Sequence, residues 1–311
     1  MKHLLTLRET SAAEIQYLLD TATALKEILG RPVKKVPTLR GRAVITCFYE
    51  NSTRTRTSFE MAAKIMSAEA INIVVSQSSV AKGESLKDTL LTLQALKADC
   101  IVMRHGSSGA AEFAAQHLQI PVINAGDGRH EHPTQGLLDM FTIRQYKGEL
   151  SGLTVAIVGD ILHSRVARSN IWGLTQLGAK VRIVAPRTLL PFDADRLPVT
   201  VYDNLKEGLE GADVVNVLRL QTERMDKGLL PSLREYSRLF GISPTSLKYA
   251  KPDALILHPG PMNRGVEISA DVADSKHGIQ SAIEEQVTNG VAVRMAVLYT
   301  LMGGQTPPAQ E

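Results

Sequence analysis

Residues 43–60 read AVITCFYENSTRTRTSFE, an apolar run followed directly by a polar run rich in threonine and arginine. Ala43–Phe48 is apolar almost throughout, which is the pattern of a parallel strand covered on both faces. Ser52 belongs to the residue types that begin helices. The apolar residues after it recur at helical spacing, at Phe59, Ala62, Ala63 and Met66. The stretch therefore predicts a strand that ends at Phe48 and leads into a helix beginning near Ser52.

The same unit, an apolar run followed by a helical pattern, recurs along the chain. An N-terminal helix is predicted from Ser11, which forms a capping box with Glu14, to Gly30. Further strands are predicted at Ile71–Val75, Asp99–Arg104, Val122–Asn124, Thr154–Val158, Lys180–Val184, Val199–Tyr202, Val214–Leu218 and Ala254–Leu257. Strands that alternate with helices indicate the α/β class with doubly wound parallel sheets.

The length of 311 residues suits two domains of about 150 residues each. The glycine-flanked stretch GELSG at 148–152 is the expected boundary, and the helix before it bridges the two halves. We therefore predict a first domain at 1–147 and a second at 148–287, joined by interdomain helices. The last helix, within 288–303, is apolar enough to pack back on the first domain.

The composition excludes several classes of protein. Lys and Arg number 35 against 32 acidic residues, and this charge of +3 is too small to indicate nucleic acid. No signal peptide is apparent, and no apolar run reaches the roughly 18 residues that a membrane span needs. Cys47 and Cys100 lie in apolar, strand-like runs and indicate reduced core thiols. A cytoplasmic enzyme is expected.

The predicted helix start after Phe48 has the features of an anion site. Its free N–H groups, the helix dipole and two arginines, Arg54 and Arg56, would converge on one point. Taken alone, such a start is also compatible with an ordinary capped helix whose arginines face water. However, the dipole disfavours cations at a helix N-terminus, and an anionic partner such as phosphate resolves that conflict.

Two further arginines stand at the ends of predicted strands. The segments LKADCIVMR and LEGADVVNVLR deliver Arg104 and Arg219 to the carboxyl ends of buried strands. In open α/β sheets ligands bind at that edge. Either arginine alone could instead extend from a strand end into solvent.

Two motifs connect the chain to a known family. Ser52-Thr53-Arg54-Thr55-Arg56 resembles the carbamoyl phosphate motif of the aspartate and ornithine carbamoyltransferases, and His132-Pro133-Thr134-Gln135 is a second match in the family's order. The resemblance covers essentially the whole chain. It implies that the first domain binds carbamoyl phosphate and that the second binds the amino-acid acceptor.

Three features resemble the branch of the family that uses aspartate. The segment 78–84, which contains Ser78 and Lys82, is similar to its mobile lysine loop, although Lys82 taken alone would be an ordinary surface lysine. The segment 219–224 is similar to its Arg-x-Gln signature for the acceptor carboxylates, and Arg165 with Arg219 offers two forks for them. His258-Pro259-Gly260-Pro261 lacks the cysteine of the ornithine branch; Gly260 departs from the leucine of some members.

The resemblance implies that the carbamoyl group of carbamoyl phosphate passes to the amine of aspartate, the committed step of pyrimidine biosynthesis. Another acceptor such as ornithine is the alternative. The catalytic residues implied are Arg54, Thr55, Arg104, His132 and Lys82. The substrate-binding residues implied are Ser52, Thr53, Arg54, Thr55, Ser78, Lys82, Arg104, His132, Gln135, Arg165, Arg219, Gln221, Gly260 and Pro261. Neither a cofactor nor a metal is implied.

The resemblance also implies a homotrimer in which the Ser78–Lys82 loop enters the neighbour's active site. It leaves open a regulatory chain or a dihydroorotase as a further partner; neither nucleic acid nor a membrane is expected. Other classes fit less well. Gly159-Asp160 follows a strand, but the dinucleotide fingerprint G-x-G-x-x-G is not completed. His130-Glu131-His132 could be half of a metal site but lacks a third ligand at suitable spacing. A non-catalytic scaffold leaves the many anion-binding groups unexplained.

Overall fold

The computed structural model describes residues 1–74, 83–221 and 228–303. The chain forms two compact units: unit 1 comprises Met1–Phe141 together with the chain from Val287 onward, and unit 2 comprises Thr142–Gln286. Two helices, α5 (Pro133–Lys147) and α10 (Ile283–Met302), each contain one of the limits between the units. The chain therefore passes between the units inside helices.

Unit 1 contains a four-stranded parallel sheet in the order β2-β1-β3-β4. Its strands are β1 (Ala43–Phe48), β2 (Glu69–Val74), β3 (Cys100–His105) and β4 (Val122–Asp127). Its other helices are α1 (Ala12–Leu29), α2 (Thr53–Ile65), α3 (Leu86–Ala95) and α4 (Ala110–His117). The predicted strands are confirmed, and β4 continues three residues beyond the prediction.

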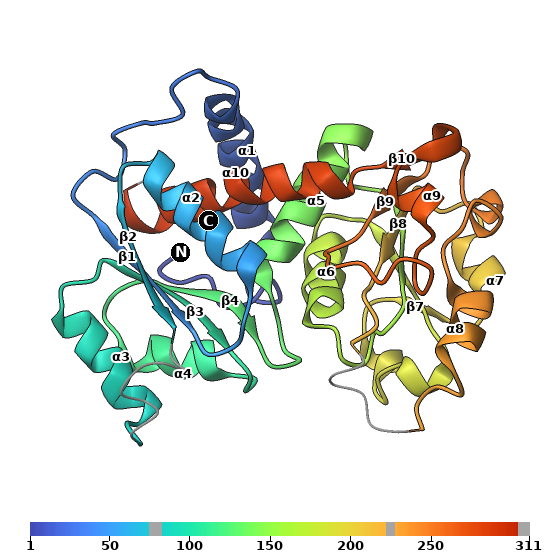
Figure 1. Cartoon of the computed structure of the whole chain (residues 1–311), viewed down its shortest axis with the longest axis horizontal. Coiled ribbons are helices and arrows are strands. Elements are labelled where there is room, and N and C mark those ends of the chain that lie inside the picture. The colour runs from blue at the N-terminus through green and yellow to red at the C-terminus, as the bar shows by residue number, and fades with distance from the viewer. Residues whose placement is uncertain (75–82, 222–227, 304–311) are drawn as a thin grey trace. The chain divides into compact units, whose positions relative to one another are not determined.

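Helices cover both faces of this sheet. Ile45 and Met103 point to the face that packs against Leu90 of α3 and Ala114 of α4. The residues that alternate with them are buried as well, and α2 contacts β1 and β2. Figure 1 shows α2 and α10 on one side of the sheet and α3 and α4 on the other. The continuous apolar runs of the sequence thus have the cause predicted for them, burial on both faces.

Unit 2 contains a six-stranded parallel sheet in the order β10-β9-β8-β5-β6-β7. Its strands are β5 (Thr154–Val158), β6 (Lys180–Val184), β7 (Thr200–Tyr202), β8 (Val214–Val217), β9 (Leu255–Leu257) and β10 (Gln280–Ser281). Its helices are α6 (Arg165–Gln176), α7 (Leu205–Leu209), α8 (Leu233–Phe240) and α9 (Ala270–Ala273), with short 3-10 turns at Arg187–Leu189, Ala194–Arg196, Ser246–Tyr249 and Lys276–Gly278. The polar strand β10 was not predicted.

The strand order reverses once in each sheet, and these points determine where a ligand can bind. In unit 1 the chain moves from β1 outward to β2 and returns on the other side as β3; in unit 2 the reversal lies between β5 and β8. In open α/β sheets the loops on the two sides of such a reversal typically separate and leave a ligand-binding crevice at the carboxyl edge. In unit 1, the register pairs Phe48 with Arg104 at that edge.

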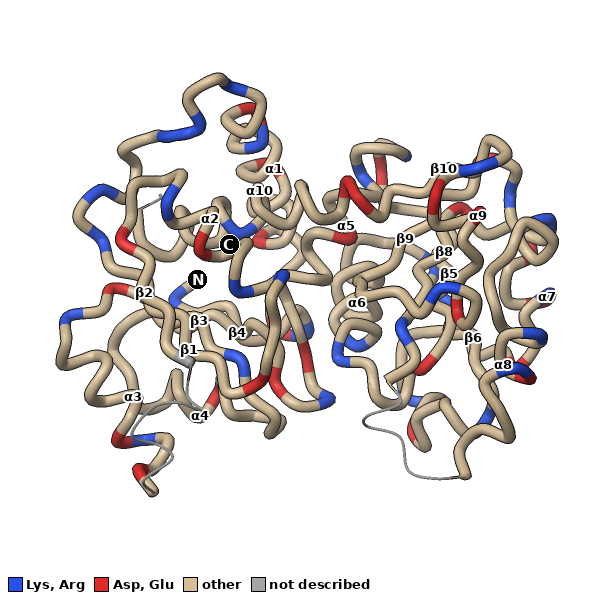
Figure 2. Tube along the Cα trace, viewed as in Figure 1, with Lys and Arg blue, Asp and Glu red and all other residues tan. Residues whose placement is uncertain are grey.

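The distribution of charges and the state of the two cysteines agree with the predictions from the sequence. Figure 2 shows acidic and basic residues interspersed along the trace of each unit. Within the described ranges, no helix is both long and apolar enough to cross a membrane. Cys47 and Cys100 are free and buried, as predicted. Burial raises the pKa of Cys47 to about 11, although a hydrogen bond with Tyr49 lowers it slightly, so this thiol stays protonated at neutral pH.

Candidate active site

The loop after β1 leads into the N-terminus of α2, where Ser52 is the N-cap residue. Thr53 and Arg54 are exposed, whereas Thr55 is buried. The helix start is confirmed, but the expectation that Ser52 caps it needs correction. Its backbone is extended, at φ −158° and ψ 95°, and its hydroxyl makes no capping hydrogen bond to the described first turn. The position is therefore that of an N-cap, while the N–H groups of the turn are not bonded by this side chain.

The end of β3 brings Arg104 to the same edge of the sheet. Its Nη1 donates to the carbonyl of Ala125 at 3.2 Å, and its Nε lies 3.5 Å from Oε2 of Glu50. Glu50 follows β1, so the ion pair joins the loop after β1 to the end of β3, on the other side of the strand reversal. Sequence reasoning did not anticipate this pair. It holds the guanidinium at the carboxyl edge of the sheet.

The loop between β4 and α5 adds His132 and Gln135. Pro133 is the first helical residue of α5, a position that proline favours, and the N–H groups of Gln135 and Gly136 donate to the carbonyl of His132. The Nε2 of His132 lies 3.5 Å from Oγ1 of Thr55. Both side chains are buried. The two predicted motifs, far apart in the sequence, therefore meet in unit 1.

Asp127 organises this loop. Its carboxylate accepts hydrogen bonds from the Gly109 N–H at 2.7 Å, the Asn124 amide at 2.8 Å, His130 at 3.1 Å and the Glu131 N–H at 3.2 Å. Burial alone would raise the pKa of Asp127, but the hydrogen bonds, with that of His130 first, lower it below its ordinary value. The residue was not predicted; the Asn-x-Gly-Asp-Gly pattern at 124–128 is its signal.

In unit 2, candidate residues occupy the loops on the two sides of the strand reversal. Ser164 caps α6, because its hydroxyl accepts from the Ala167 N–H at 3.1 Å, and Arg165 is the first residue of the helix. Arg219 and Gln221 follow β8 and are partly buried. Arg165 is buried, with 4% of its surface exposed.

A buried polar cluster lies behind these loops. Asp160 is fully buried, and its Oδ1 accepts from Nδ1 of His163 at 2.8 Å. Burial raises the pKa of Asp160, while hydrogen bonds from His163 and from the backbone of Gln221 oppose the shift. Tyr236 is also buried, and burial followed by the charges of Glu267 and Asp160 raises its pKa. The cluster links the loop after β5 to the segment that carries Gln221.

The loop after β9 is tied to the loop after β8. The Gly260 N–H donates to Nδ1 of His258 at 2.8 Å, so Nε2 of His258 carries the proton that it shares with Oε1 of Glu267 at 3.2 Å. The same carboxylate accepts from the Asn263 N–H, and the Asn263 amide donates to the carbonyl of Leu220 at 3.3 Å. Gly260 has φ +62°, where glycine carries no steric strain, and a cis peptide bond joins it to Pro261. Gly260 and Pro261 therefore belong to one hydrogen-bonded framework with the segment around Arg219.

The remaining predicted residues are placed as follows. Ser78 and Lys82 lie outside the described residues. The three side chains of His130-Glu131-His132 have separate partners: Asp127, the backbone of Leu7 and Arg8, and Thr55. Among the residues that the structure describes, no group of three His, Cys, Asp or Glu side chains could hold a metal ion.

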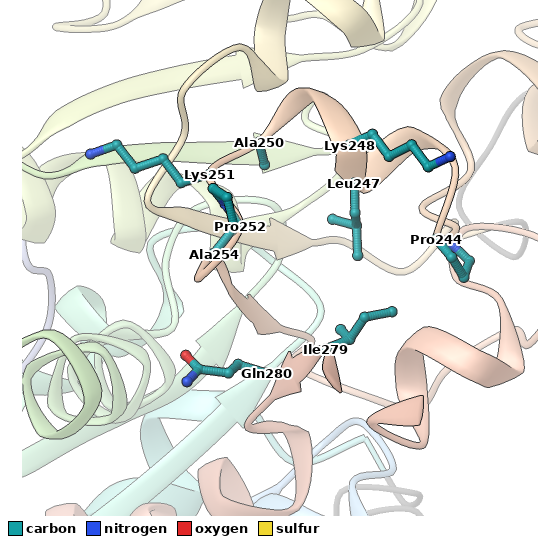
Figure 3. A pocket seen from close by; sticks show the side chains of 9 residues that line it. All are labelled: Pro244, Leu247, Lys248, Ala250, Lys251, Pro252, Ala254, Ile279 and Gln280. Carbon is teal, nitrogen blue, oxygen red and sulfur yellow. The ribbon is translucent and has the colours of Figure 1, made fainter. Parts of the chain in front are cut away.

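A pocket of about 330 Å³ opens elsewhere in unit 2 (Figure 3). Its lining includes Ala254 and Gln280, which stand at the amino ends of β9 and β10. Leu247 and Ile279 face each other across it, while the side chains of Lys248 and Lys251 extend away in opposite directions. Because the strands are parallel, this pocket lies at the edge of the sheet opposite to the candidate residues.

Comparison with known proteins assigns both halves of the chain. Residues 2–145 match the description "Aspartate/ornithine carbamoyltransferase, carbamoyl-P binding domain", and residues 151–301 match "Aspartate/ornithine carbamoyltransferase, Asp/Orn binding domain". The chain belongs to the aspartate/ornithine carbamoyltransferase family. It is therefore a carbamoyltransferase, and the resemblance inferred from the two motifs is confirmed.

Individual relatives cover nearly the full length. The aspartate carbamoyltransferase catalytic subunit of Desulforamulus reducens is 63% identical over 304 residues, which are 98% of this chain and 96% of the relative. Aspartate transcarbamoylase from Trypanosoma cruzi in complex with carbamoyl aspartate and phosphate has a TM-score of 0.86 at 31% identity, covering 97% and 96% of the two chains. Ornithine carbamoyltransferase from Pyrococcus furiosus has a TM-score of 0.85 at 29% identity, covering 98% of each.

Proposed function

We propose that the chain transfers the carbamoyl group of carbamoyl phosphate to the α-amino group of L-aspartate, giving N-carbamoyl-L-aspartate and phosphate. The observation that carries the choice of acceptor is sequence identity. A relative named for aspartate is 63% identical, whereas the ornithine enzyme above is 29% identical. The fold does not discriminate, because the TM-scores of 0.86 and 0.85 are nearly equal.

Unit 1 supplies the groups that suit carbamoyl phosphate. The phosphate is assigned to Ser52, Thr53, Arg54 and Thr55 at the start of α2, where free N–H groups and the helix dipole favour an anion. Arg104, Thr55 and His132 polarise the carbonyl oxygen, an assignment supported by the contact between Thr55 and His132. Gln135 holds the carbamoyl nitrogen, and the family resemblance adds the backbone of Gly260 and Pro261, which belong to unit 2. Residues 1–147 with 288–303 are the proposed carbamoyl phosphate domain.

Unit 2, in the proposed domain 148–287, supplies the groups that suit aspartate. Arg165 and Arg219 pair with its two carboxylates, and Gln221 adds a hydrogen bond. Their positions on the loops beside the strand reversal support this role, as do the hydrogen bonds that hold those loops.

The chemistry then requires no nucleophile from the protein. The neutral amine of aspartate attacks the carbamoyl carbon, a tetrahedral oxyanion forms, and the C–O bond to phosphate breaks as the departing phosphate takes the amine proton. Catalysis comes from orientation and from stabilisation of the oxyanion. No cofactor takes part in the reaction written this way.

Product identification tests the proposal. Carbamoyl phosphate and L-aspartate are incubated with the purified chain, and N-carbamoyl-L-aspartate and phosphate are quantified together, with Arg54→Ala as the control for contaminating activity. We expect equal amounts of the two products and a large loss in the control. Phosphate release without the carbamoylated amino acid would contradict the proposal.

The family resemblance and the cysteines also bear on assembly and location. A homotrimer in which the segment containing Ser78 and Lys82 serves a neighbouring chain follows from the family resemblance. A regulatory chain or a dihydroorotase could attach to it. The cytoplasm is the proposed compartment, supported by the two free, buried cysteines.

A further inference from the structure

Gln135 has a buried partner outside the residues discussed so far. Its Nε2 donates to Oδ1 of Asp139 at 2.9 Å, one turn further along α5. Gln135 is 8% exposed and Asp139 is completely buried. A carboxylate has only acceptor atoms, so the NH2 group of the amide must be the one that faces it. The carbonyl oxygen Oε1 of Gln135 is consequently turned away from Asp139, as an acceptor.

A buried cation accompanies this carboxylate. Arg294 of α10 is 3% exposed, in an otherwise apolar stretch of helix. Burial lowers the pKa of Arg294 to about 10, although the charge of Asp139 opposes the shift, so the guanidinium remains protonated at neutral pH. An isolated buried charge of either sign would be costly, and the two charges offset each other.

The guanidinium is itself held in place by two elements. Nη1 of Arg294 donates to the carbonyl of Gly290 at 2.9 Å, within α10. Its Cζ lies 5.2 Å from the centroid of the Phe59 ring, within the range of a cation–π contact. Phe59 is a buried residue of α2, whose first turn carries the proposed phosphate site. Arg294 therefore contacts α2 through Phe59, Asp139 contacts Gln135, and the charges of Arg294 and Asp139 attract each other.

We propose that Asp139 and Arg294 are positioning residues that lock the Gln135 amide with its carbonyl oxygen toward the carbamoyl nitrogen, and that they thereby select a carbamoyl over an acyl phosphate. The inference rests on the proposed function, because it takes carbamoyl phosphate as the ligand of unit 1. A locked oxygen accepts a hydrogen bond from the NH2 of carbamoyl phosphate. The methyl group of acetyl phosphate has no such donor.

The test is a ratio of equilibrium affinities. Asp139→Asn replaces a group that only accepts with one that can also donate to Oε1, so the amide is no longer forced into one orientation. Calorimetry is used to measure the Kd of carbamoyl phosphate, acetyl phosphate and inorganic phosphate. We expect the preference for carbamoyl over acetyl phosphate to fall about tenfold, the equivalent of one hydrogen bond of about 1.4 kcal/mol. The Kd of inorganic phosphate should stay within about twofold.

The chain offers a matched control. Gln16 and Asp20 form the same pair four residues apart on α1, at 3.1 Å, but on the surface. Asp20→Asn should change neither the preference for carbamoyl over acetyl phosphate nor the Kd of inorganic phosphate. A second comparison uses Gln135→Met, which removes the acceptor: in that background Asp139→Asn should have no further effect on the ratio, since Asp139 acts through Gln135.

A double variant keeps the test valid if Asp139→Asn alone does not fold. Asp139→Asn leaves a buried cation without its counter-charge, whereas Asp139→Asn with Arg294→Met removes both charges and should fold. It should show the same fall in the ratio. An unchanged ratio, or an equal loss of affinity for all three ligands, would overturn the inference. Because the measurement is binding without an acceptor, it is independent of whether aspartate is the second substrate.

Discussion

Arg104 is the proposed donor to the oxyanion. Its side chain is 14% exposed, and its guanidinium contacts Glu50 and the carbonyl of Ala125. Arg104→Ala should reduce kcat by about two to three orders of magnitude, the usual loss for one oxyanion donor. Steady-state kinetics with both substrates measures it. Arg42→Ala is the control, because Arg42 pairs with Asp99 just before β1, at the opposite edge of the same sheet. A variant of Arg104 that keeps more than half the turnover would rule out this role.

Asp160 shows a conflict between stability and function at one residue. Its folded-state pKa is raised by burial, so the folded chain holds this proton more tightly than the unfolded chain. The stability that the proton contributes is fully present below the ordinary value of 3.8 and is lost as the pH rises through the raised pKa. The charged carboxylate therefore costs stability at neutral pH.

Asp160→Asn is accordingly expected to keep or raise Tm at pH 7.5, with a difference from wild type that shrinks as the pH falls toward 4. The aspartate KM should rise, since the carboxylate no longer holds the backbone of Gln221. Calorimetric scans across this pH range, together with kinetics, provide the comparison. A Tm more than about 3 °C below wild type at pH 7.5, roughly 1 kcal/mol for a chain of this size, would show that the charge is stabilising.

Among the structural elements, the β4–α5 loop depends on a single glycine. Gly128 has φ +47°, and a Cβ atom there would collide with the side chain and backbone of Ser108. Gly128→Ala should therefore lose more than about 2 kcal/mol of stability, from backbone strain and overlap together. Gly41→Ala is a matched control, because Gly41 has φ +82° with nothing within 4 Å of the added atom, so only strain of about 1 kcal/mol applies. Urea unfolding of both variants measures the two losses of unfolding free energy. Equal losses would mean that Ser108 moves aside at little cost.

The same elements show what the sequence could and could not predict. β1, β5 and β6 agree with their apolar runs residue by residue, because strands buried on both faces have an unambiguous pattern. β10 has only Gln280 and Ser281, and a polar pair has no pattern to recognise. Ser52 and Ser11 are both residues of a type that begins helices, and both are N-cap residues, but only the side chain of Ser11 makes the capping bond. The residue type indicates where a helix starts. Whether the side chain makes the capping hydrogen bond depends on the backbone angles of that residue.

Those residues of the candidate site that belong to a motif at the end of a strand could be predicted from the sequence. The register brings Arg104 beside Phe48, and the meeting of Thr55 with His132 follows from two loops of one sheet edge. The supporting residues were missed because no motif marks them, and some of their contacts are with residues distant in sequence. Arg294 is 155 positions from Asp139 in the numbering (294 − 139), and its only signal is one charge in the apolar stretch 291–301. Glu267 has nearer partners, His258 and Asn263, but no recognisable motif joins it to them.

For the whole molecule, shared sites are the strongest expectation beyond one chain. Arg54→Ala and Lys82→Ala should each be nearly inactive alone. If neighbouring chains build each site together, mixing the two after dissociation and reassembly should restore activity, because some interfaces then pair an intact Arg54 with an intact Lys82. Each variant taken through the same procedure by itself is the control. Verified subunit exchange without recovered activity would mean that each chain builds its own site.

The identity of the acceptor can be measured directly. With carbamoyl phosphate saturating, kcat/KM is determined separately for L-aspartate and L-ornithine. Two arginines and a glutamine suit two carboxylates, while the ammonium group of ornithine would stand unpaired near like charge, so we predict a preference for aspartate of about 10⁴-fold or more. Equal values, or a preference for ornithine, would contradict the assignment.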